Sequence, residues 1–270
     1  MEEKMKKKVN IFSNLYKITN EIRKIVEDEL VANNFIVTDE FDENADFNIV
    51  IGGDGTFIKA VHDSNFSEIP FIGINTGHLG FYNDVHHNEV AETIQKIKNN
   101  NYFIHNLRYI DCKVSTDDNI YEFNSLNELV LKAKYTSVLH FNLYVDDVML
   151  ESFAGDGVMF STPSGSTAYN LSAGGAIMYQ SIDAFQITPL APIRSALHRS
   201  LDKSLIVPKD TKIKLITRKR EDTQFALGID GLHQEIESIN YIDIQLSKNT
   251  IQKVVFDKNW FWKNIKEKFI

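Results

Sequence analysis

Cysteine is almost missing from this sequence, since Cys112 is the only one among its 270 residues. A single cysteine cannot form a disulfide within the chain, which fits a protein of the reducing cytosol. Cys112 lies in the strand-like segment 109–114, where we expect a small packing residue rather than a nucleophile. Proline is also scarce, at five residues, and there is neither a low-complexity run nor a repeat of fixed period. A disordered chain and a solenoid are therefore excluded.

Long apolar runs and an excess of positive charge are missing too. No apolar run approaches the roughly 20 residues that a membrane-spanning helix needs. The segment 1–8 is charged and lacks the apolar centre of a signal peptide. The chain has 29 Lys and Arg against 37 Asp and Glu, a formal net charge of −8, which disfavours general binding to nucleic acid or to anionic membranes. We therefore expect a cytoplasmic protein whose partners include neither nucleic acid nor a membrane.

What the sequence does contain begins with about 100 residues in which strand and helix patterns alternate. Runs rich in β-branched residues predict strands at 8–12, 35–38, 46–51 and 69–74. Apolar residues at helical spacing predict helices over about 15–30 and 88–99. Such alternation is typical of a Rossmann-like open parallel sheet, whose ligands bind beyond the carboxyl ends of its strands.

The pattern changes near residue 102, where short β-rich runs separated by turn residues replace the alternation. This series is typical of an all-β domain, which we place at residues 103–252. The predicted fold class is therefore α/β plus all-β.

The C-terminal tail 260–269 is typical of a short helix rich in aromatic residues. Because exposed Trp260 and Trp262 would be costly, we expect the tail to dock back on the first domain. The α/β domain is accordingly predicted to consist of residues 1–102 and 253–270.

Two glycine-rich turns follow predicted strands. The first, Gly52-Gly53-Asp54-Gly55-Thr56, opens a helical pattern, and the second covers residues 75–80, where we expect His78 to be a structural donor. Glycine N–H groups and the positive end of the next helix favour an anion such as phosphate. Asp54 is the one carboxylate in the first turn, and the turn by itself supports a catalytic role and a turn-shaping role equally.

A second unusual segment interrupts the β-rich region after Gly155-Asp156-Gly157. Residues 161–175 are almost all Ser, Thr, Pro, Gly, Ala or Asn. Side chains of this size form a polar surface that a ligand can approach closely, and Tyr169 within it can stack on a base. A serine hydrolase is disfavoured because no Gly-x-Ser-x-Gly elbow surrounds Ser164 or Ser166.

Taken together, these elements resemble the NAD kinase family, in its small bacterial type. The Gly-Gly-Asp-Gly turn alone is weak evidence, because lipid kinases and phosphofructokinases carry similar turns, whereas the segment 162–169 is far more specific. The matching elements follow the family's order and span most of the chain: residues 52–56, 73–81, Asn127-Glu128, 155–157 with 161–169, and Asp230-Gly231.

The resemblance implies transfer of the γ-phosphoryl group of ATP to the 2′-hydroxyl of the adenosine ribose of NAD, giving NADP. It also implies an N-terminal Rossmann-like α/β domain, a C-terminal β-sandwich that binds NAD, and a homo-oligomer, commonly a tetramer. A divalent metal cation, with Mg²⁺ as the expected ion, would accompany ATP as co-substrate.

Asp54 is then expected to be the general base. A ribose hydroxyl is a poor nucleophile at neutral pH, and a carboxylate within hydrogen-bond reach can accept its proton as attack proceeds. Phosphoryl transfer otherwise relies on positioning and charge neutralisation, which glycine amides and a metal ion supply. Gly53 and Gly55 are expected beside Asp54 in the nucleotide site. Coordination of magnesium by Asp54 remains open as an alternative, and no metal ligand is assigned.

The resemblance also implies a set of NAD contacts in the β-rich region. One residue of the pair Asn127 and Glu128 is expected to bind the adenine edge, and the other the ribose hydroxyls. Ala168 would admit the base closely, and Tyr169 would stack on it. The implied NAD contacts are Asn127, Glu128, Asp156, Ser164, Thr167, Ala168, Tyr169, Asn170, Leu171, Ser172 and Ala191.

Three details of the match leave alternatives open. Asp156 matches an aspartate that contacts the nicotinamide end of NAD, within the subunit or across an interface. Asp230-Gly231 is either part of the site or a plain hairpin turn. Many relatives carry arginine directly before Gly155, whereas this chain has Ala154, so another basic residue or water would have to replace that charge.

Two other functions compete with an NAD kinase. A catalytically silent dinucleotide-binding regulator would bind NAD or NADP without forming product, and Ala154 is the only feature that favours it. A lipid kinase would share the glycine turn, but the chain shows no convincing membrane-surface helix.

Overall fold

The computed structural model describes residues 6–77, 79–135, 137–194, 200–218 and 225–270. The chain divides into two compact units, Met1–Leu107 with Thr250–Ile270 and Arg108–Asn249, which we call the α/β unit and the β unit. No helix among the described residues is long and apolar enough to cross a membrane.

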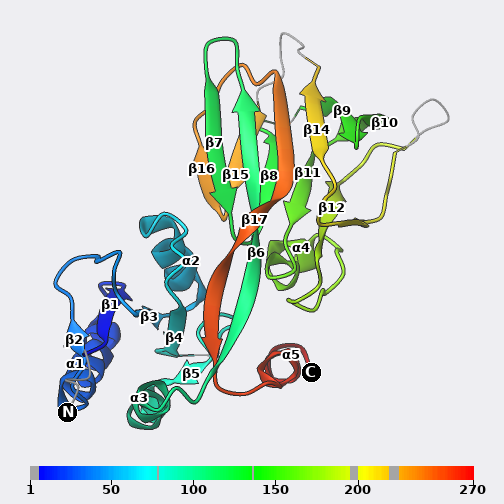
Figure 1. The fold of residues 1–270 in the computed structure, drawn as a ribbon. Helices are drawn as coiled ribbons and strands as arrows, with labels where there is room; N and C mark the ends of the chain where they lie inside the picture. Colours follow the sequence, from blue (N-terminus) through cyan, green and yellow to red (C-terminus); the bar gives the residue numbers. More distant parts are fainter. Residues whose placement is uncertain (1–5, 78, 136, 195–199, 219–224) are drawn as a thin grey trace. The chain divides into compact units, whose positions relative to one another are not determined.

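The α/β unit is built on a parallel sheet with the strand order β2-β1-β3-β4 (Figure 1). Strand β5 and the last part of β17 also pair with β4. Its elements are β1 (Lys8–Ser13), α1 (Lys17–Ala32), β2 (Ile36–Val37), β3 (Phe47–Gly52), α2 (Asp54–Asp63), β4 (Phe71–Asn75), β5 (Val85–His86), the 3₁₀-helix η1 (His87–Glu89), α3 (Val90–Lys98) and α5 (Trp260–Phe269).

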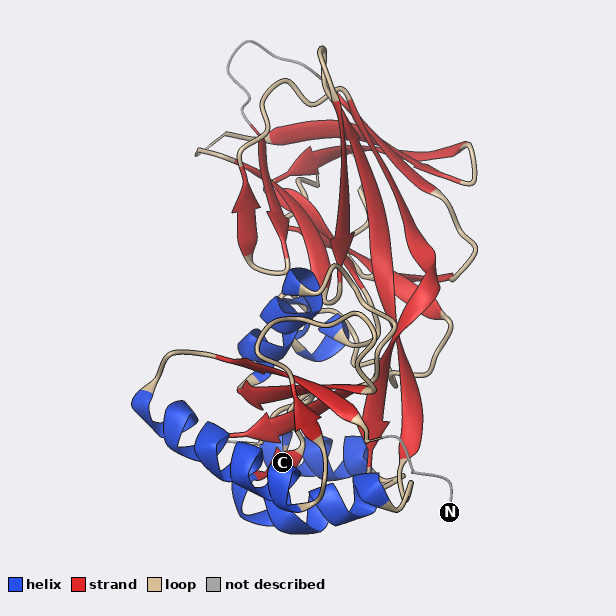
Figure 2. Cartoon of the chain, turned by 60° about the vertical axis from the view of Figure 1, so that its left-hand side comes forward, coloured by secondary structure: helices blue, strands red, loops and turns tan. Residues whose placement is uncertain are grey.

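Helices cover both faces of this sheet (Figure 2). Successive side chains of a strand point to opposite faces, so a sheet with apolar residues at successive positions needs a cover on both sides. On one face Ile49 and Ile51 belong to the apolar core that α1 and α3 close. On the other face Phe71 packs against Phe57 of α2, with ring centroids 5.5 Å apart. A strand buried on both sides is rich in apolar residues, as β3 is at Ile49, Val50 and Ile51, and this pattern predicts the sheet from the sequence.

The β unit contains two sheets, ordered β10-β9-β14-β17-β6-β7 and β13-β12-β11-β8-β15-β16. Leu129 and Phe160 of the second sheet share one core with Phe141 and Leu215 of the first, so the unit is a β-sandwich. Its elements are β6 (Phe103–Ser115), β7 (Ile120–Ser125), β8 (Glu128–Ala133), β9 (Leu139–Val145), β10 (Val148–Gly155), β11 (Gly157–Ser161), η2 (Gly165–Thr167), α4 (Tyr169–Ser172), β12 (Ala184–Leu190), β13 (Leu205–Pro208), β14 (Ile213–Thr217), β15 (Phe225–Ile229), β16 (Leu232–Gln234) and β17 (Tyr241–Val255).

The C-terminal helix α5 packs within the α/β unit, as the aromatic tail predicts. Trp260 and Phe261 are buried, and the Lys253 ammonium, which is ion-paired with Asp84 at 2.9 Å, lies 3.7 Å from the centre of the Trp260 ring. The expectation for Trp262 is wrong, since this side chain is 59% exposed. An amphipathic helix buries one face only, and Trp262 lies outside it. The predicted fold class, with an α/β domain, a β-sandwich and a returning tail, is confirmed.

Candidate functional site

The two glycine-rich turns lie at the same edge of the parallel sheet. Gly52, the last residue of β3, pairs in register with Asn75, the last residue of β4. The Thr76 N–H donates to the Gly52 carbonyl across the two turns at 3.4 Å. Both turns therefore follow the carboxyl ends of neighbouring strands, where a parallel sheet binds its ligands. His78 of the second turn lies outside the described residues.

Asp54 begins helix α2, and its carboxylate is fixed by the backbone that follows the second turn. Its Oδ2 accepts the Phe81 N–H at 2.8 Å, and its Oδ1 accepts the N–H groups of Tyr82 and Asn83 at 2.9 and 3.3 Å. The Asn83 side chain completes the connection by donating to the Gly53 carbonyl at 3.1 Å. Three backbone donors hold a carboxylate in one orientation. Asp54 therefore has one defined position, and its side chain is still 30% exposed.

Two close neighbours restrict Asp54 further. A Cβ atom added to Gly80 would lie 2.0 Å from Asp54 Oδ1, so only glycine leaves room for the carboxylate. From the last turn of α5, the Lys268 ammonium lies 3.5 Å from Asp54 Oδ2. The same helix holds the adjoining backbone, because Asn264 Nδ2 donates to the Gly80 carbonyl at 2.9 Å.

Gly53 and Gly55, which flank Asp54 in the sequence, leave open space around the backbone. A Cβ atom added to either glycine would meet nothing within 4 Å. The Thr56 N–H already donates to the Gly53 carbonyl at 2.9 Å. The first N–H groups of a helix, here those of Asp54 and Gly55, precede any acceptor in their own helix and favour a negatively charged group. The geometry provides one held carboxylate beside an open position for an anion.

In the β unit, Asp230 fixes the segment that carries Asn127 and Glu128. Its Oδ1 accepts the N–H groups of these two residues at 2.7 and 3.2 Å, and its Oδ2 accepts the Leu126 N–H at 2.7 Å. Asp230 and Gly231 also form the turn between β15 and β16, and both have positive φ. The pair is a hairpin turn whose carboxylate also anchors residues 126–128, and whether it takes part in the site stays a prediction.

The serine-rich segment packs directly on Asn127. The Thr162 N–H donates to the Asn127 carbonyl at 2.9 Å, and Thr162 Oγ1 donates to the Leu126 carbonyl at 2.7 Å. A Cβ atom added to Gly165 would lie 2.1 Å from the Asn127 carbonyl oxygen, which requires glycine there. The fold thereby brings together two groups of predicted NAD contacts that are far apart in the sequence.

Three of these predicted contacts bury polar atoms that have no partner in the described part of the chain. They are Glu128 Oε2, Ser164 Oγ and Asn170 Nδ2. The three residues are at most 7% exposed. Buried polar atoms are nearly always paired, and each orphan costs roughly 1–3 kcal/mol, so a group that supplies partners from outside the chain is expected here.

The remaining predicted contacts lie at the rims of this region. Thr167, Ala168 and Leu171 are half-buried and Ser172 is exposed, all in or beside η2 and α4. Exposed Asp156 joins β10 to β11, and its N–H donates to the Leu190 carbonyl at 3.0 Å. Ala191 follows Leu190 with φ 43°, and its carbonyl would lie 2.8 Å from a Cβ atom added to Gly155. Asp156 and Ala191 are therefore neighbours.

Lys132 is a residue of this region that the sequence analysis did not select. Its ammonium donates to the Tyr169 hydroxyl and lies 4.5 Å from the centre of the Tyr169 ring. The sequence signal that could have indicated Lys132 is the alternation of side chains along β8. Glu128 and Lys132 are four residues apart, so they point to the same face of the strand.

Glu128 makes a testable contribution to stability. Burial, and secondarily the negative charge of Asp230, raise its pKa from 4.5 to about 7. The folded chain then binds this proton more tightly than the unfolded chain, so this contribution is complete below pH 4.5 and is lost as the pH rises through 7. The shift corresponds to roughly 3 kcal/mol.

We expect the free energy of unfolding from urea titrations to fall less between pH 5 and pH 8 in Glu128→Gln than in the original chain. Exposed Glu237→Gln is the control, and equal slopes for all three proteins would contradict the prediction.

Among the described residues, no group of three or more His, Cys, Asp or Glu side chains is arranged to hold a metal ion. Asp54 also directs both carboxylate oxygens at backbone N–H groups. A divalent cation that arrives bound to nucleotide phosphates needs few protein ligands, whereas a resident ion needs a cage of them. The described residues around Asp54 fit the first case better than the second.

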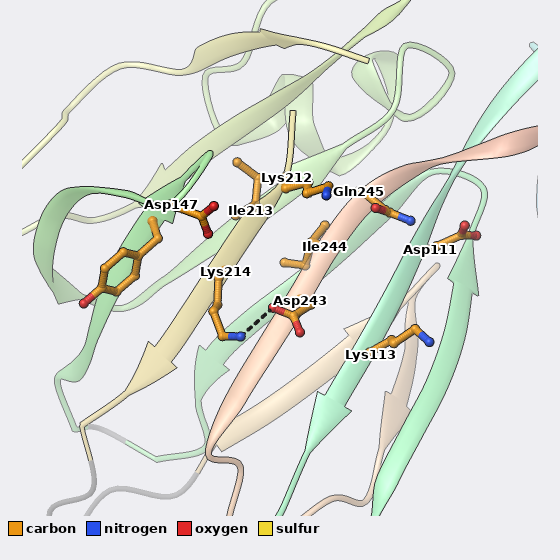
Figure 3. Close-up of a pocket in the computed structure, with 10 residues that line it drawn as sticks. Asp111, Lys113, Asp147, Lys212, Ile213, Lys214, Asp243, Ile244 and Gln245 are labelled. Atoms are coloured by element: carbon orange, nitrogen blue, oxygen red, sulfur yellow. Dashed lines mark ion pairs between the residues drawn. The ribbon is translucent and has the colours of Figure 1, made fainter. Parts of the chain in front are cut away.

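A separate hollow on the first sheet of the β unit contains none of the predicted site residues (Figure 3). Its charged side chains balance each other, as Lys214 and Asp243 do at 3.2 Å. Lys113, also in this hollow, is paired with Glu122 at 2.7 Å. Since these charges are already compensated, the hollow offers no net charge for a nucleotide.

The fold and these features fit a phosphotransferase that acts on a nucleotide, and the comparison with known families assigns the chain to this class. Models of two domains match this chain: the ATP-NAD kinase N-terminal domain over residues 1–102 and the ATP-NAD kinase C-terminal domain over residues 126–255. The chain belongs to the NAD kinase family.

Similar proteins agree with this assignment. The NAD kinase of Finegoldia magna is 44% identical over 97% of both chains. That of Staphylococcus epidermidis is 35% identical over 86% of this chain and 87% of its own. Among solved structures, yeast NADH kinase complexed with NADH has a TM-score of 0.86 at 21% identity, covering 98% of this chain and 88% of its own. An NAD kinase from Archaeoglobus fulgidus in complex with ATP has a TM-score of 0.75 at 22% identity, covering 96% and 98%. These two structures support the fold.

Proposed function

We propose that this chain is an ATP-dependent NAD kinase in which Asp54 is the general base. The reaction of its family is the transfer of the γ-phosphoryl group of ATP to the 2′-hydroxyl of the adenosine ribose of NAD, giving NADP. The observation that carries the assignment of the base is the Asp54 carboxylate, fixed by three backbone N–H groups beside an open, glycine-lined helix start.

In this mechanism the ribose oxygen attacks the γ-phosphorus while its proton passes to Asp54. The bond between the γ-phosphorus and the bridging oxygen breaks, and ADP leaves with the bonding pair. Asp54 suits this role because its orientation is set before the substrate binds, so no rearrangement is needed at the moment of transfer.

Gly53, Gly55 and the first turn of α2 are proposed to hold the phosphates of ATP. The open space at both glycines lets phosphate oxygens approach the backbone N–H groups closely. A divalent cation, Mg²⁺ in our proposal, would enter bound to the ATP phosphates and neutralise their charge during transfer. Because the Asp54 oxygens already accept backbone hydrogen bonds, we favour the base role over metal coordination.

The β unit is proposed to present NAD. Glu128, Ser164 and Asn170 would pair their orphan polar atoms with the adenosine half, and Tyr169, at 39% exposed, would stack on the adenine. Asp156 and Ala191, neighbours at the end of β10 and β12, would contact the nicotinamide half. The other proposed contacts are Asn127, Thr167, Ala168, Leu171 and Ser172.

We further propose that residues 1–102 with 253–270 act as the ATP-binding domain and residues 103–252 as the NAD-binding domain. By resemblance to the family we propose a cytoplasmic homotetramer. Light scattering of the purified protein tests the tetramer.

An assay of NADP formation tests the function. Purified protein, ATP, Mg²⁺ and NAD are expected to yield NADP, detected with an NADP-specific dehydrogenase. Binding of NAD by calorimetry without product would instead favour a silent regulator, and phosphate transfer to a lipid but not to NAD would favour a lipid kinase. Polyphosphate in place of ATP and NADH in place of NAD define the range of donor and acceptor.

A further inference from the structure

Lys132 lies on the sheet face that carries the predicted NAD contacts. In β8 the side chains of Leu129 and Leu131 enter the sandwich core, so Glu128, Val130 and Lys132 point the opposite way. Val130 packs there with Met159, Leu190 and Ala173, the residue directly after α4. We call this side of the second sheet the α4 face.

Register confirms the position of Lys132 on the α4 face. Across the second sheet, Lys132 pairs with Gly157 of β11 and with Ala226 of β15, and Glu128 pairs with Ser161. Since directly opposed residues share a face, the described strands place one lysine, Lys132, and no arginine on the α4 face.

The ammonium of Lys132 is directed at Tyr169. It donates to the Tyr169 hydroxyl and lies 4.5 Å from the ring centre, while the side chain as a whole remains half-buried. At its backbone end Lys132 adjoins the Asp156 turn, because the Ala133 N–H donates to the Asp156 carbonyl at 3.1 Å. Its positive charge therefore has a fixed position beside the tyrosine proposed to stack on adenine.

We propose that Lys132 binds the phosphates of the dinucleotide, an inference that rests on the proposed NAD site. In a dinucleotide the pyrophosphate is separated from the adenine by one ribose, which places its negative charge within reach of a cation at Tyr169. A lysine ammonium is a compact donor of three hydrogen bonds that binds phosphate as a point charge. In a chain of net charge −8, a local cation is needed to offset the repulsion of an anionic substrate.

Steady-state kinetics of Lys132→Met test this inference. We expect the KM for NAD to rise about tenfold, the typical effect of losing one charge-assisted hydrogen bond, with kcat and the KM for ATP unchanged. Lys132→Arg retains the charge and is expected to stay within about threefold of the original KM. Lys113→Met, which removes a lysine from the hollow of Figure 3, is the matched control and should leave all constants unchanged.

Inhibition by adenosine, which has no phosphate, shows whether Lys132 contacts the phosphates of NAD or its adenosine half. We expect its inhibition constant against NAD to be the same for the original chain and Lys132→Met. An equal loss for adenosine and NAD would show that Lys132 only supports Tyr169, and an unchanged KM for NAD would show that it has no role in binding; either result overturns the inference. If the original chain forms no NADP at all, the proposed function fails instead.

Discussion

Replacement of Asp54 by asparagine is expected to lower kcat about 10³-fold while the KM for NAD changes less than about threefold. A positioned general base typically contributes 10²- to 10⁴-fold, and asparagine cannot accept the ribose proton. Asparagine has nearly the same shape but offers only one acceptor oxygen to the N–H groups of Phe81, Tyr82 and Asn83, so we expect a small loss of thermal stability as well. Steady-state kinetics together with a thermal melt separate the two effects.

Asp63→Asn is the matched control for this experiment. Asp63 lies at the other end of α2, is exposed and is paired only with Lys59 at 2.6 Å in the described contacts. Its replacement should leave kcat unchanged. A titration with Mg²⁺ distinguishes the alternative role of Asp54, because a lost metal ligand would be partly compensated by a higher Mg²⁺ concentration and a lost base would not. Normal turnover of Asp54→Asn would refute both roles.

Gly80→Ala is expected to lower kcat about 10²-fold without unfolding the protein. The new methyl group would lie 2.0 Å from Asp54 Oδ1, and the carboxylate is the group that can move away. A displacement of about 1 Å at a reacting group typically costs 10²-fold in rate. Since the proposed NAD contacts other than Asp54 belong to the β unit, the affinity for NAD measured by calorimetry should stay close to that of the original chain.

Gly77→Ala provides the comparison for Gly80→Ala, because it adds the same methyl group to the same turn. At Gly77 a Cβ atom would meet nothing within 4 Å, so activity should be retained. If both variants were equally active, the position of the Asp54 carboxylate would not limit the reaction.

The sequence predicted those parts of the molecule that depend on local pattern. Strand β3 is rich in apolar residues and ends at Gly52, and β4 is rich in apolar residues and runs into the second glycine-rich turn at Asn75. The sheet and the common edge of its two turns therefore follow from the chain itself. Asp54 is conspicuous as the one carboxylate in its turn. The assignment of Asp54 and the NAD contacts as a site rests on the family resemblance and remains a prediction.

The features that the sequence did not predict are contacts between residues far apart in the chain. Nothing near Asp230 indicates that its carboxylate accepts N–H groups about 100 residues earlier, and the sequence therefore did not distinguish a plain turn from a part of the site. Lys132 meets Tyr169 only because β8 and α4 pack on one sheet face. Trp262 was assigned to the wrong side of its helix, because spacing alone does not show which face of a short helix is buried.

Helix α5 has a consequence for synthesis on the ribosome. Phe81, whose N–H binds Asp54, packs against the Phe261 and Phe269 rings at 6.2 and 6.0 Å, and Lys268 lies beside the carboxylate itself. These partners are translated long after residues 52–83, and β17, which completes the same sheet, is also late. A nascent chain that has emerged only as far as residue 250 thus contains the whole glycine turn but not the helix that supports it. The surroundings of Asp54 can therefore be completed only after residues 253–269 have been synthesised, whatever the order in which the rest of the chain folds.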